Sequence, residues 1–527
     1  MKKIGFVLVI LMAVTLLFTG CGGGGGDSKG PAKLRVEIFD RGSDGGRSLA
    51  YDNAWTDWVK EKVLNDLNIE LEFVPVGRWT EDTDITNLLA AGSAPDLCYT
   101  YNTGMINNFS QQGGILDLTP YIDTFLPDMK KLLGTDPAIP GQDLIYRDRD
   151  PLTGKQYSVT SYVVYTARRA IFIRKDWLDK LGLPLPRTMQ EFYEALIAFR
   201  DQDPGGVGRN RVIPLFTEAD VRWQLANFML PYINTNLNPK DEWINGPWYD
   251  RPVLLPGYKE GVRLMNKWYN EGLIYRDFPL LRDGNNDGDA LRMGGTIGAF
   301  SQNWDYPFRT DYAIQTTMAQ NVPGAVWYPI SLEGPNGVSN EISDKPGLRI
   351  FIPAASKNHE AALRYLNWLC KYENFHFLQA GEQGVNHSIE NGVPRIQAMP
   401  AGHAWFQNSP NNIDMTIPMN GIEMLDPELN GRVTALSFAG IAPEIVVETL
   451  RTATINGYVR TIYQANLNKL GEFSMVLQLK ADELLTRAIT TSPTNFDRVW
   501  DDGIRDYLQS GGQEVIDERT AAWAAGH

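Results

Sequence analysis

The sequence predicts an α/β protein, and three neighbouring segments near its start carry that prediction. Residues 33–39 and 69–75 alternate apolar and polar side chains with a period of two, as half-buried β-strands do. Between them, residues 53–67 place apolar side chains near helical spacing. Because two strands joined through a helix commonly lie parallel in one sheet, these segments indicate a parallel α/β unit.

Elements of both kinds continue along the chain. Residues 84–91 favour a helix, and residues 94–101 a turn that leads into a third buried strand. Thr188 followed by Glu191 is a capping box, which predicts a helix from there to Arg200. Further strands are expected at 157–165 and 170–173, and further helices at 258–271, 359–372 and 482–489. The string 174–184 favours a short helix that Gly182 and Pro184 stop.

Composition narrows the class of protein. The chain has 527 residues, of which 43% are hydrophobic, 49 are Lys or Arg and 63 are Asp or Glu. These values argue against disorder and against a polytopic membrane protein, and the length fits about three domains or two large lobes. A formal net charge of −14 offers no basic surface for counterion release, so we expect no nucleic-acid partner.

The N-terminus has the pattern of an export signal. Two lysines precede an apolar stretch at residues 4–18, which is too short for a stable membrane span. Residues 18–21 resemble a bacterial lipobox that ends in Cys21, and a glycine run follows. We therefore predict a signal peptide at 1–20, lipid modification of Cys21 and a flexible tether at 21–32. The alternative is a plain secretory signal with an incidental cysteine.

The other two cysteines, Cys98 and Cys370, both lie in apolar strings. Free cysteine behaves as a small hydrophobic residue and is often buried. We predict two separate reduced thiols, with a single disulfide as the alternative.

A set of motifs in fixed order is similar to a known family, the family 1 extracellular solute-binding proteins of ABC transporters. The strongest strings are GKQY at 154–157, IFIRKDWLDKLGLP at 171–184 and TMQEFYEAL at 188–196. Supporting strings are APD at 94–96, YNEGLI at 269–274, GGTIGAF at 294–300 and GEQGVNHSIENG at 381–392. The resemblance extends from near Leu34 to the C-terminus and points to a long lipoprotein branch that includes alginate-fragment binders.

This resemblance implies a two-lobed periplasmic-binding-protein-like fold with a ligand cleft between the lobes. We expect the N-terminal lobe to comprise residues 31–160 plus 296–345, and the C-terminal lobe residues 161–295 plus 346–527. The implied function is capture of a carbohydrate, an oligosaccharide above all, by lobe closure and its delivery to ABC permease subunits. The implied protein is a membrane-anchored monomer without catalysis or cofactor. The alternatives are an exported glycoside-acting enzyme and a binder of a peptide or other polar solute.

Several relatives in this branch carry a calcium loop after the helix that here ends at Arg200. In this chain the corresponding loop, Asp201 to Arg211, has Gly205, Val207 and Arg209 where alternate ligands would stand. Calcium takes about six to eight oxygen ligands, and arginine repels the ion. We therefore predict no structural calcium there. The chain also lacks the His-Glu-x-x-His, Gly-x-Ser-x-Gly and Walker motifs, so the common motif-bearing enzyme sites have no support.

Candidate ligand contacts are aromatic and polar residues at strand ends and helix starts. Sugar rings stack on Trp and Tyr, and side-chain amides and carboxylates bind hydroxyl groups. The candidates are Trp79, Tyr99, Tyr101, Asn102, Trp223, Trp304, Asp305 and Glu382. We further expect Trp223 and Trp304 to face each other across the cleft, one from each lobe, whereas Trp55, Trp58, Trp177 and Trp368 fit core positions on helices.

Overall fold

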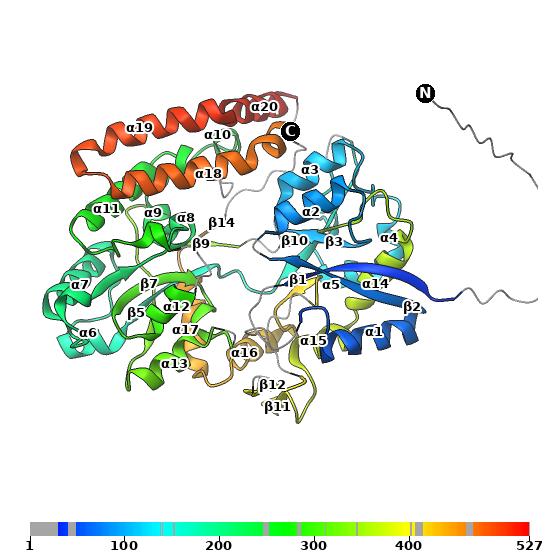
Figure 1. The fold of residues 1–527 in the computed structure, drawn as a ribbon, viewed down its shortest axis with the longest axis horizontal. Helices are drawn as coiled ribbons and strands as arrows, with labels where there is room; N and C mark the ends of the chain where they lie inside the picture. The colour runs from blue at the N-terminus through cyan, green and yellow to red at the C-terminus, as the bar shows by residue number, and fades with distance from the viewer. Residues whose placement is uncertain are drawn as a thin grey trace, which may run out of the picture.

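The computed structural model describes residues 30–525 with gaps at 41–48, 79, 138, 140, 151–152, 235, 246–251, 282–285, 311, 344–345, 401–402, 406–414 and 460–466. The chain forms two lobes, drawn right and left in Figure 1, and each lobe has helices packed around a β-sheet. This is the two-lobed α/β architecture that the sequence predicts.

The first lobe is built on a four-stranded sheet and an adjoining strand pair. The pair is β1 (Ala32–Asp40) with β2 (Ile69–Gly77), which run parallel, and a parallel bridge from Val36 to Leu97 joins β1 to the start of β3. The sheet has the order β13 (Met419–Asn420), β4 (Val159–Val163), β10 (Pro346–Phe351), β3 (Cys98–Thr100). Its helices are α1 (Ala54–Leu67), α2 (Glu81–Ala90), α3 (Thr103–Gln111), α4 (Ile122–Phe125), α5 (Pro127–Leu133), α14 (His359–Leu369) and α15 (Tyr372–Ala380).

The second lobe surrounds a sheet of order β6 (Ile213–Phe216), β7 (Ile297–Asn303), β5 (Arg169–Arg174), β8 (Trp327–Ile330). Both faces of this sheet are buried: Ile171 and Ile173 of β5 enter one hydrophobic core, and Ala170 and Phe172 enter the other. Its helices are α6 (Lys175–Leu181), α7 (Met189–Gln202), α8 (Val221–Gln224), α9 (Ala226–Met229), α10 (Pro239–Ile244), α11 (Tyr258–Asn270), α12 (Asn286–Met293), α13 (Ile314–Asn321) and α17 (Pro443–Thr454).

Three C-terminal helices form a layer on the second lobe: α18 (Asn468–Thr490), α19 (Phe496–Tyr507) and α20 (Gln513–Ala524) (Figure 1). Leu477, Leu484 and Leu485 of α18 belong to the same core as Ile171 and Ile173. Smaller elements complete the fold: the pair β9 (Asn340–Ile342) with β14 (Gly457–Val459), the hairpin β11 (His387–Glu390) with β12 (Val393–Ile396), and helix α16 (Asn430–Ala435). No helix in the described part of the chain is both long and apolar enough to cross a membrane.

The chain passes between the lobes after β4, between β9 and β10, and after β13. The first two passages run together, because Ala167 forms a bridge with Ile342 and the Ser343 N–H donates to the Thr166 carbonyl at 2.6 Å. The third joins them through the Val164 N–H, which donates to the Asn420 carbonyl at 3.1 Å. Several crossing segments that contact one another form the hinge region.

The structure corrects the expected lobe boundaries. The sequence predicts residues 296–345 in the first lobe, but β7 and β8 both pair with β5 in the second-lobe sheet. It predicts residues 346–527 in the second lobe, but β10 runs antiparallel between β3 and β4 of the first. Strand partners so far apart in sequence leave no trace in local periodicity, which is why the boundaries were misplaced.

Cys98 and Cys370 are free and buried, as predicted. Cys98 lies on β3, and Cys370 directly follows α14. Burial raises the pKa of both thiols well above the usual value, so both stay protonated and unreactive.

Candidate functional site

The first lobe presents an aromatic ring at the shared end of β1 and β3. The parallel bridge between these strands puts their carboxyl ends at one edge, where ligands of open α/β sheets collect. Tyr101, just after β3, is 42% exposed. The Arg78 guanidinium carbon lies 4.6 Å from the Tyr101 ring centroid and 5.2 Å from that of Phe39. Phe39, Arg78 and Tyr101 are called the first-lobe patch below.

Carboxylates behind this patch hold it in place. Arg78 donates to Glu81 at 2.7 Å, and Glu81 also accepts the Tyr101 N–H at 3.1 Å. Burial raises the pKa of Glu81, while the charge of Arg78 opposes that shift. Asp82 is similar: burial raises its pKa, and a hydrogen bond from Asn102 lowers it.

Tyr99 and Asn102, two other predicted first-lobe contacts, make hydrogen bonds within their own lobe. Tyr99 is completely buried; its hydroxyl oxygen accepts the Phe39 N–H at 3.0 Å, and its own N–H donates to Glu37 at 2.9 Å. These two side chains bridge β1 and β3 where backbone pairing stops. Asn102 caps α3 by accepting the Met105 N–H at 3.1 Å, so its carbonyl oxygen is engaged in the helix start.

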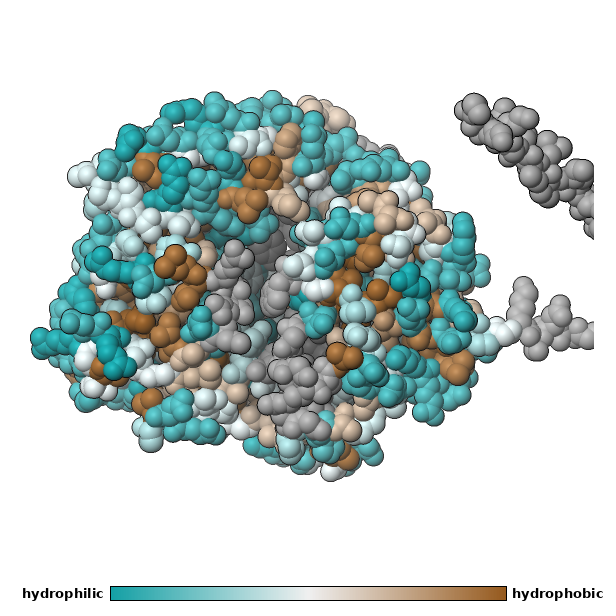
Figure 2. All heavy atoms as spheres, in the orientation of Figure 1, coloured by the Kyte–Doolittle hydropathy of each residue, from teal (hydrophilic) through white to brown (hydrophobic). Residues whose placement is uncertain are grey.

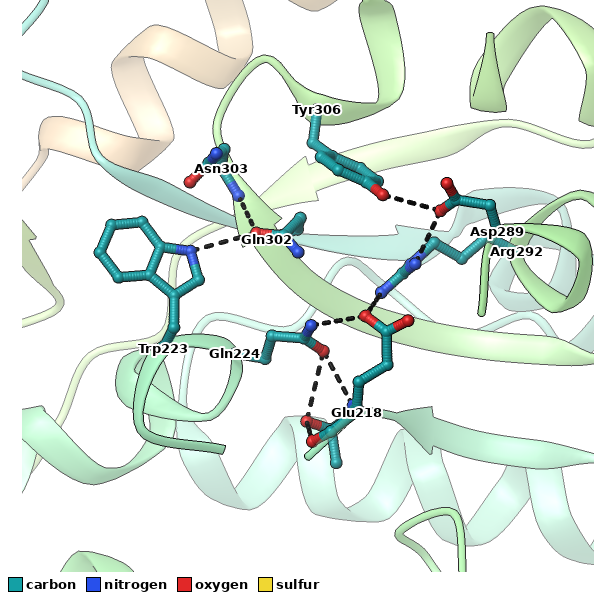
Figure 3. A network of polar contacts seen from close by, with 9 residues as sticks. Glu218, Trp223, Gln224, Asp289, Arg292, Gln302, Asn303 and Tyr306 are labelled. Carbon is teal, nitrogen blue, oxygen red and sulfur yellow. Dashed lines mark hydrogen bonds and ion pairs between the residues drawn. The ribbon is translucent and has the colours of Figure 1, made fainter. Parts of the chain in front are cut away.

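The second lobe presents an indole ring. Trp223 lies on the short helix α8, whose first turn is capped by Asp220. Its Nε1–H donates to Gln302 at the end of β7 at 3.1 Å, and Figure 3 shows the ring beside the strand end. The guanidinium carbons of Arg169 and Arg168 lie 4.4 and 5.1 Å from the ring centroid. Arg168, Arg169 and Trp223 are called the second-lobe patch.

Ion pairs fix the arginines of this patch. Arg168 and Arg169 both pair with Glu341, which stands on β9 beside the hinge. All three side chains are largely buried, so a cation–π contact there is stronger than on an open surface. Arg222, next to Trp223, donates to Asp482 of α18 at 3.1 Å.

A buried polar network supports the loop before α8 (Figure 3). Glu218 accepts hydrogen bonds from Gln224 at 2.6 Å and from Arg292 at 2.7 Å. Arg292 also donates to Asp289 at 2.8 Å, and Asp289 accepts the Tyr306 hydroxyl at 2.8 Å. Because Gln224 ends the same helix turn that carries Trp223, this network orients the indole. Its members lie up to 88 residues apart, between Glu218 and Tyr306, so local sequence gave no signal of it.

Trp304 and Asp305 lie inside the second lobe. Trp304 is 5% exposed, and its ring packs edge-on against Tyr165 at 4.9 Å. Asp305 is 2% exposed and pairs with Arg309 at 2.8 Å. The expectation that Trp223 and Trp304 come from opposite lobes is wrong, because Trp304 follows β7 and β7 belongs to the second-lobe sheet.

The remaining candidates lie elsewhere. Glu382 is exposed in the turn after α15, where its N–H donates to Asn386 at 3.1 Å. Trp79 and Cys21 lie outside the described residues. Arg78, Arg168 and Arg169 are not among the residues predicted from sequence. Arg78 directly follows β2, so its position at a strand end, like that of Tyr101, is a signal that could have found it.

Helix α18 contacts elements that adjoin both patches, α3 in the first lobe and α8 in the second. It contacts α3, which begins two residues after Tyr101, and it carries Asp482, the partner of Arg222. Figure 2 shows the molecular surface hollowed between the lobes. The two patches therefore stand on opposite lobes and are connected by one rigid helix.

The described residues contain no group of three or more His, Cys, Asp or Glu side chains placed to hold a metal ion. In the loop from Asp201 to Arg211, the Asp203 carboxylate accepts the N–H groups of Val207 and Gly208 at 3.0 and 2.8 Å. Asp201 pairs with Arg200 at 2.7 Å. The predicted lack of calcium in this loop stays a prediction.

Comparison with known proteins decides the family. The model of the bacterial extracellular solute-binding protein family matches residues 47–374, more than half of the chain. The chain belongs to the bacterial extracellular solute-binding protein family. This confirms the resemblance inferred from the motifs, and it makes the protein a relative of binding proteins rather than of enzymes.

One curated relative resembles part of this solute-binding protein in sequence, and two solved structures resemble it in fold. Polygalacturonan/rhamnogalacturonan-binding protein YtcQ of Bacillus subtilis is 28% identical over 231 residues, 42% of this chain and 43% of YtcQ. The chain thus spans less than half the length of that curated relative. The crystal structure of alginate-binding protein AlgQ2 without calcium ion superposes with a TM-score of 0.68 at 18% identity, covering 94% of this chain and 99% of AlgQ2. Streptococcus pneumoniae FusA in complex with kestose gives a TM-score of 0.63 at 16% identity, covering 94% and 99% of the two chains.

Proposed function

We propose that the protein is the carbohydrate-binding subunit of an ABC importer, which captures an oligosaccharide between its lobes and delivers it to permease subunits. The observation that carries the proposal is a pair of arginine-backed aromatic rings, Tyr101 on one lobe and Trp223 on the other. Sugar rings stack on such faces, while charged and amide side chains bind their hydroxyl groups. The ligands named for YtcQ, AlgQ2 and FusA support the same ligand class.

The proposed ligand contacts include fewer of the residues that the sequence predicts. Tyr101 and Trp223 supply the stacking faces, with Asn102 and the patch arginines beside them. Tyr99, Trp304 and Asp305 are buried in the lobes and act by supporting these faces. Trp79 and Glu382 stay as weaker candidates.

A thermal-shift screen tests the ligand class. The panel contains polygalacturonan fragments, alginate oligosaccharides, kestose and a set of short peptides. A ligand that binds only the folded protein raises its melting temperature. We expect at least one oligosaccharide to do so and no peptide. Mass spectrometry of the same mixtures should recover the sugar intact; release of shorter sugars would instead indicate a glycoside-acting enzyme.

Calorimetry with the sugar so identified tests the site. Tyr101→Ala and Trp223→Ala should each weaken binding by about thirtyfold, the loss typical of an aromatic anchor. Trp58→Ala is the matched control for Trp223→Ala, because Trp58 is also a half-buried tryptophan with a cation beside its ring. Its ring centroid lies 4.4 Å from that of Phe377 and 5.9 Å from Lys62 Nζ. Trp58 stands on α1, away from both patches. Binding within about threefold of the parent for both site variants would place the ligand elsewhere.

We also propose that the protein is exported as a monomer and anchored to the membrane by lipid on Cys21. Two acyl signals hold a protein on a bilayer stably, whereas one does so only weakly. Cys21→Ala should move the protein from the membrane fraction to the soluble exported fraction. Cys98→Ala, which changes a buried thiol, should leave the distribution unchanged. Sedimentation of the soluble variant measures its oligomeric state.

A further inference from the structure

The two lobes touch through two glycines. Helix α3 of the first lobe packs on α18 of the second-lobe layer, with Gly104 opposite Gly471. A Cβ added at Gly471 would lie 2.9 Å from the Gly104 carbonyl oxygen and 3.3 Å from the Asn108 Cβ. A Cβ added at Gly104 would lie 3.2 Å from Ser474 Oγ. The helices are therefore in contact backbone to backbone.

Neither glycine is required by its own helix. The glycines with positive φ include neither Gly104 nor Gly471, so any residue could adopt their conformations. A glycine inside a helix weakens that helix relative to alanine. Since local structure gives no reason for glycine at these positions, the close approach of the two helices supplies it.

The contact has the composition of a reversible interface. Toward its own lobe, α18 buries Leu477, Leu484 and Leu485 in a large hydrophobic core. Toward the first lobe it presents Gly471 and Ser474, which are small or polar. Separating α3 from α18 would expose little apolar surface, so water opposes that separation only weakly.

The contact also lies between the two patches. Asn102, directly after Tyr101, caps α3, and Gly104 stands in the first turn of that helix. On α18, Asp482 pairs with Arg222 beside Trp223. Asp482 lies eleven residues after Gly471, a separation of about 16 Å at about 1.5 Å per helical residue. Because α18 is one continuous helix, the distance between α3 and α18 at the glycine contact determines the distance between the rings of Tyr101 and Trp223.

We propose that Gly104 and Gly471 are positioning residues that meet when the lobes close and stop the closure at a fixed separation of Tyr101 and Trp223. A larger side chain at either position holds the lobes further apart. The stop thereby sets the thickness of ligand that the closed cleft grips. The inference rests on the proposed function only in calling the gripped molecule a carbohydrate.

Interlobe distances test the stop without any ligand. Spin labels at Glu61 of α1 and Glu194 of α7, both exposed, report the lobe separation by double electron–electron resonance. In unliganded protein, Gly471→Leu should remove the shortest distances seen in the parent. The matched control is Gly431→Leu, because Gly431 is an exposed glycine of α16 with nothing within 4 Å of an added Cβ. Equal distance distributions for the two variants would overturn the proposal.

A disulfide provides an independent test should Gly471→Leu fail to fold. Gly104→Cys combined with Ser474→Cys places two thiols where a disulfide can form, since the Gly104 Cβ position is 3.2 Å from Ser474 Oγ. The oxidised protein should show only the short label distances, and reductant should restore the parent distribution. Failure of the bond to form, or unchanged distances after it forms, would show that the lobes do not meet there in solution.

Ligand kinetics separate this inference from the proposed function. The Gly471→Leu variant should release a bound oligosaccharide about tenfold faster than the parent does. Without ligand, its melting temperature should equal that of Gly431→Leu. A purely structural role would lower the melting temperature and leave the release rate unchanged. If no sugar binds at all, the proposed ligand is wrong, and the label distances still decide whether the glycines stop closure.

Discussion

Arg169 lies over the ring of Trp223, with its guanidinium carbon 4.4 Å from the ring centroid, while the same guanidinium pairs with Glu341. Glu341 stands on β9 next to Ile342, which forms the bridge to Ala167 in the hinge region. One carboxylate therefore connects the hinge to an aromatic face of the candidate site. A change in the hinge backbone would move the arginine and, with it, the surface on which the ring rests.

Replacement of Glu341 tests this connection. Glu341→Gln keeps the shape of the side chain but removes the buried carboxylate that Arg168 and Arg169 share, and breaking a buried ion pair typically costs about 3 kcal/mol. We expect the free energy of unfolding, measured in urea, to fall by about that amount. Glu390→Gln is the control, since Glu390 pairs with Arg395 in the open, where an ion pair contributes about 0.5 kcal/mol. Similar losses for both variants would mean that the buried ion pairs of Glu341 stabilise the protein no more than the exposed pair of Glu390.

Glu37 makes stability depend on pH above pH 4.5, the usual pKa of its carboxyl group. Its side chain is fully buried, and burial raises its pKa well above the usual 4.5, with the charge of Glu81 adding to the shift. An acid whose pKa is raised on folding stabilises the folded state below pH 4.5 and loses that contribution as the pH rises toward the raised pKa. Glu37→Gln removes the ionisation, so its melting temperature relative to the parent should rise between about pH 5 and about pH 8.

The amide of this variant can still accept the Tyr99 N–H, which keeps the link between β1 and β3. Glu70→Gln, an exposed change on β2, is the control and should track the parent at every pH. If the melting temperatures of Glu37→Gln and the parent differ by the same amount at every pH between about 5 and about 8, Glu37 does not change its charge in that range.

Two histidines should destabilise the protein in acid. Burial lowers the pKa of His376 and of His387 below 6.5, and the charge of His387 lowers that of His376 further. The unfolded chain binds protons near pH 6.5 and the folded one only at lower pH, so stability is lost as the pH falls below 6.5. Urea midpoints of the parent should therefore drop between about pH 7 and about pH 5.

His376→Gln should flatten that drop, because the half-buried ring stacked on Tyr372 at 4.9 Å no longer titrates. His403→Gln changes an exposed histidine and serves as the control. Identical pH dependence in the two variants would assign the acid sensitivity to other groups.

Local patterns in the sequence were enough to locate several individual elements, although the helix expected at 359–372 ends at Leu369 and the helix expected at 482–489 begins as early as Asn468. The capping box predicted at Thr188 forms in full: Thr188 accepts the Glu191 N–H, and Glu191 accepts the Thr188 N–H, both at 3.2 Å. The strand expected at 33–39 is β1, and the helix expected at 258–271 is α11. Such signals lie within a few residues of one another, so one sequence suffices to find them.

Long-range pairing limited the rest. The lobe membership of β7 and β10 depends on partners that lie far along the chain, and the position of Trp304 followed from the lobe assigned to β7. Trp223 was recognised from its helix start, whereas its support by Arg169 and Glu341 needs contacts across 172 residues. Aromatic candidates could be found from sequence, but the direction each ring faces could not.

The last prediction concerns the buried network that orients α8. A Cβ added at Gly288 of α12 would lie 1.9 Å from Glu218 Oε1. Glu218 cannot simply rotate away, because Arg292 and Gln224 both donate to its other oxygen. In an open helix, Gly→Ala stabilises by about 1 kcal/mol. In Gly288→Ala, overpacking of about 1 to 3 kcal/mol opposes that gain, so we expect a net loss of stability. Gly431→Ala, with open space around its Cβ, should stay equal to the parent or become more stable.

Tryptophan fluorescence and ligand affinity should change in Gly288→Ala alone, since displaced Glu218 releases Gln224 and the helix turn that carries Trp223. A stabilised Gly288→Ala protein with unchanged affinity would show that Glu218 has room to move and that the network does not position the indole.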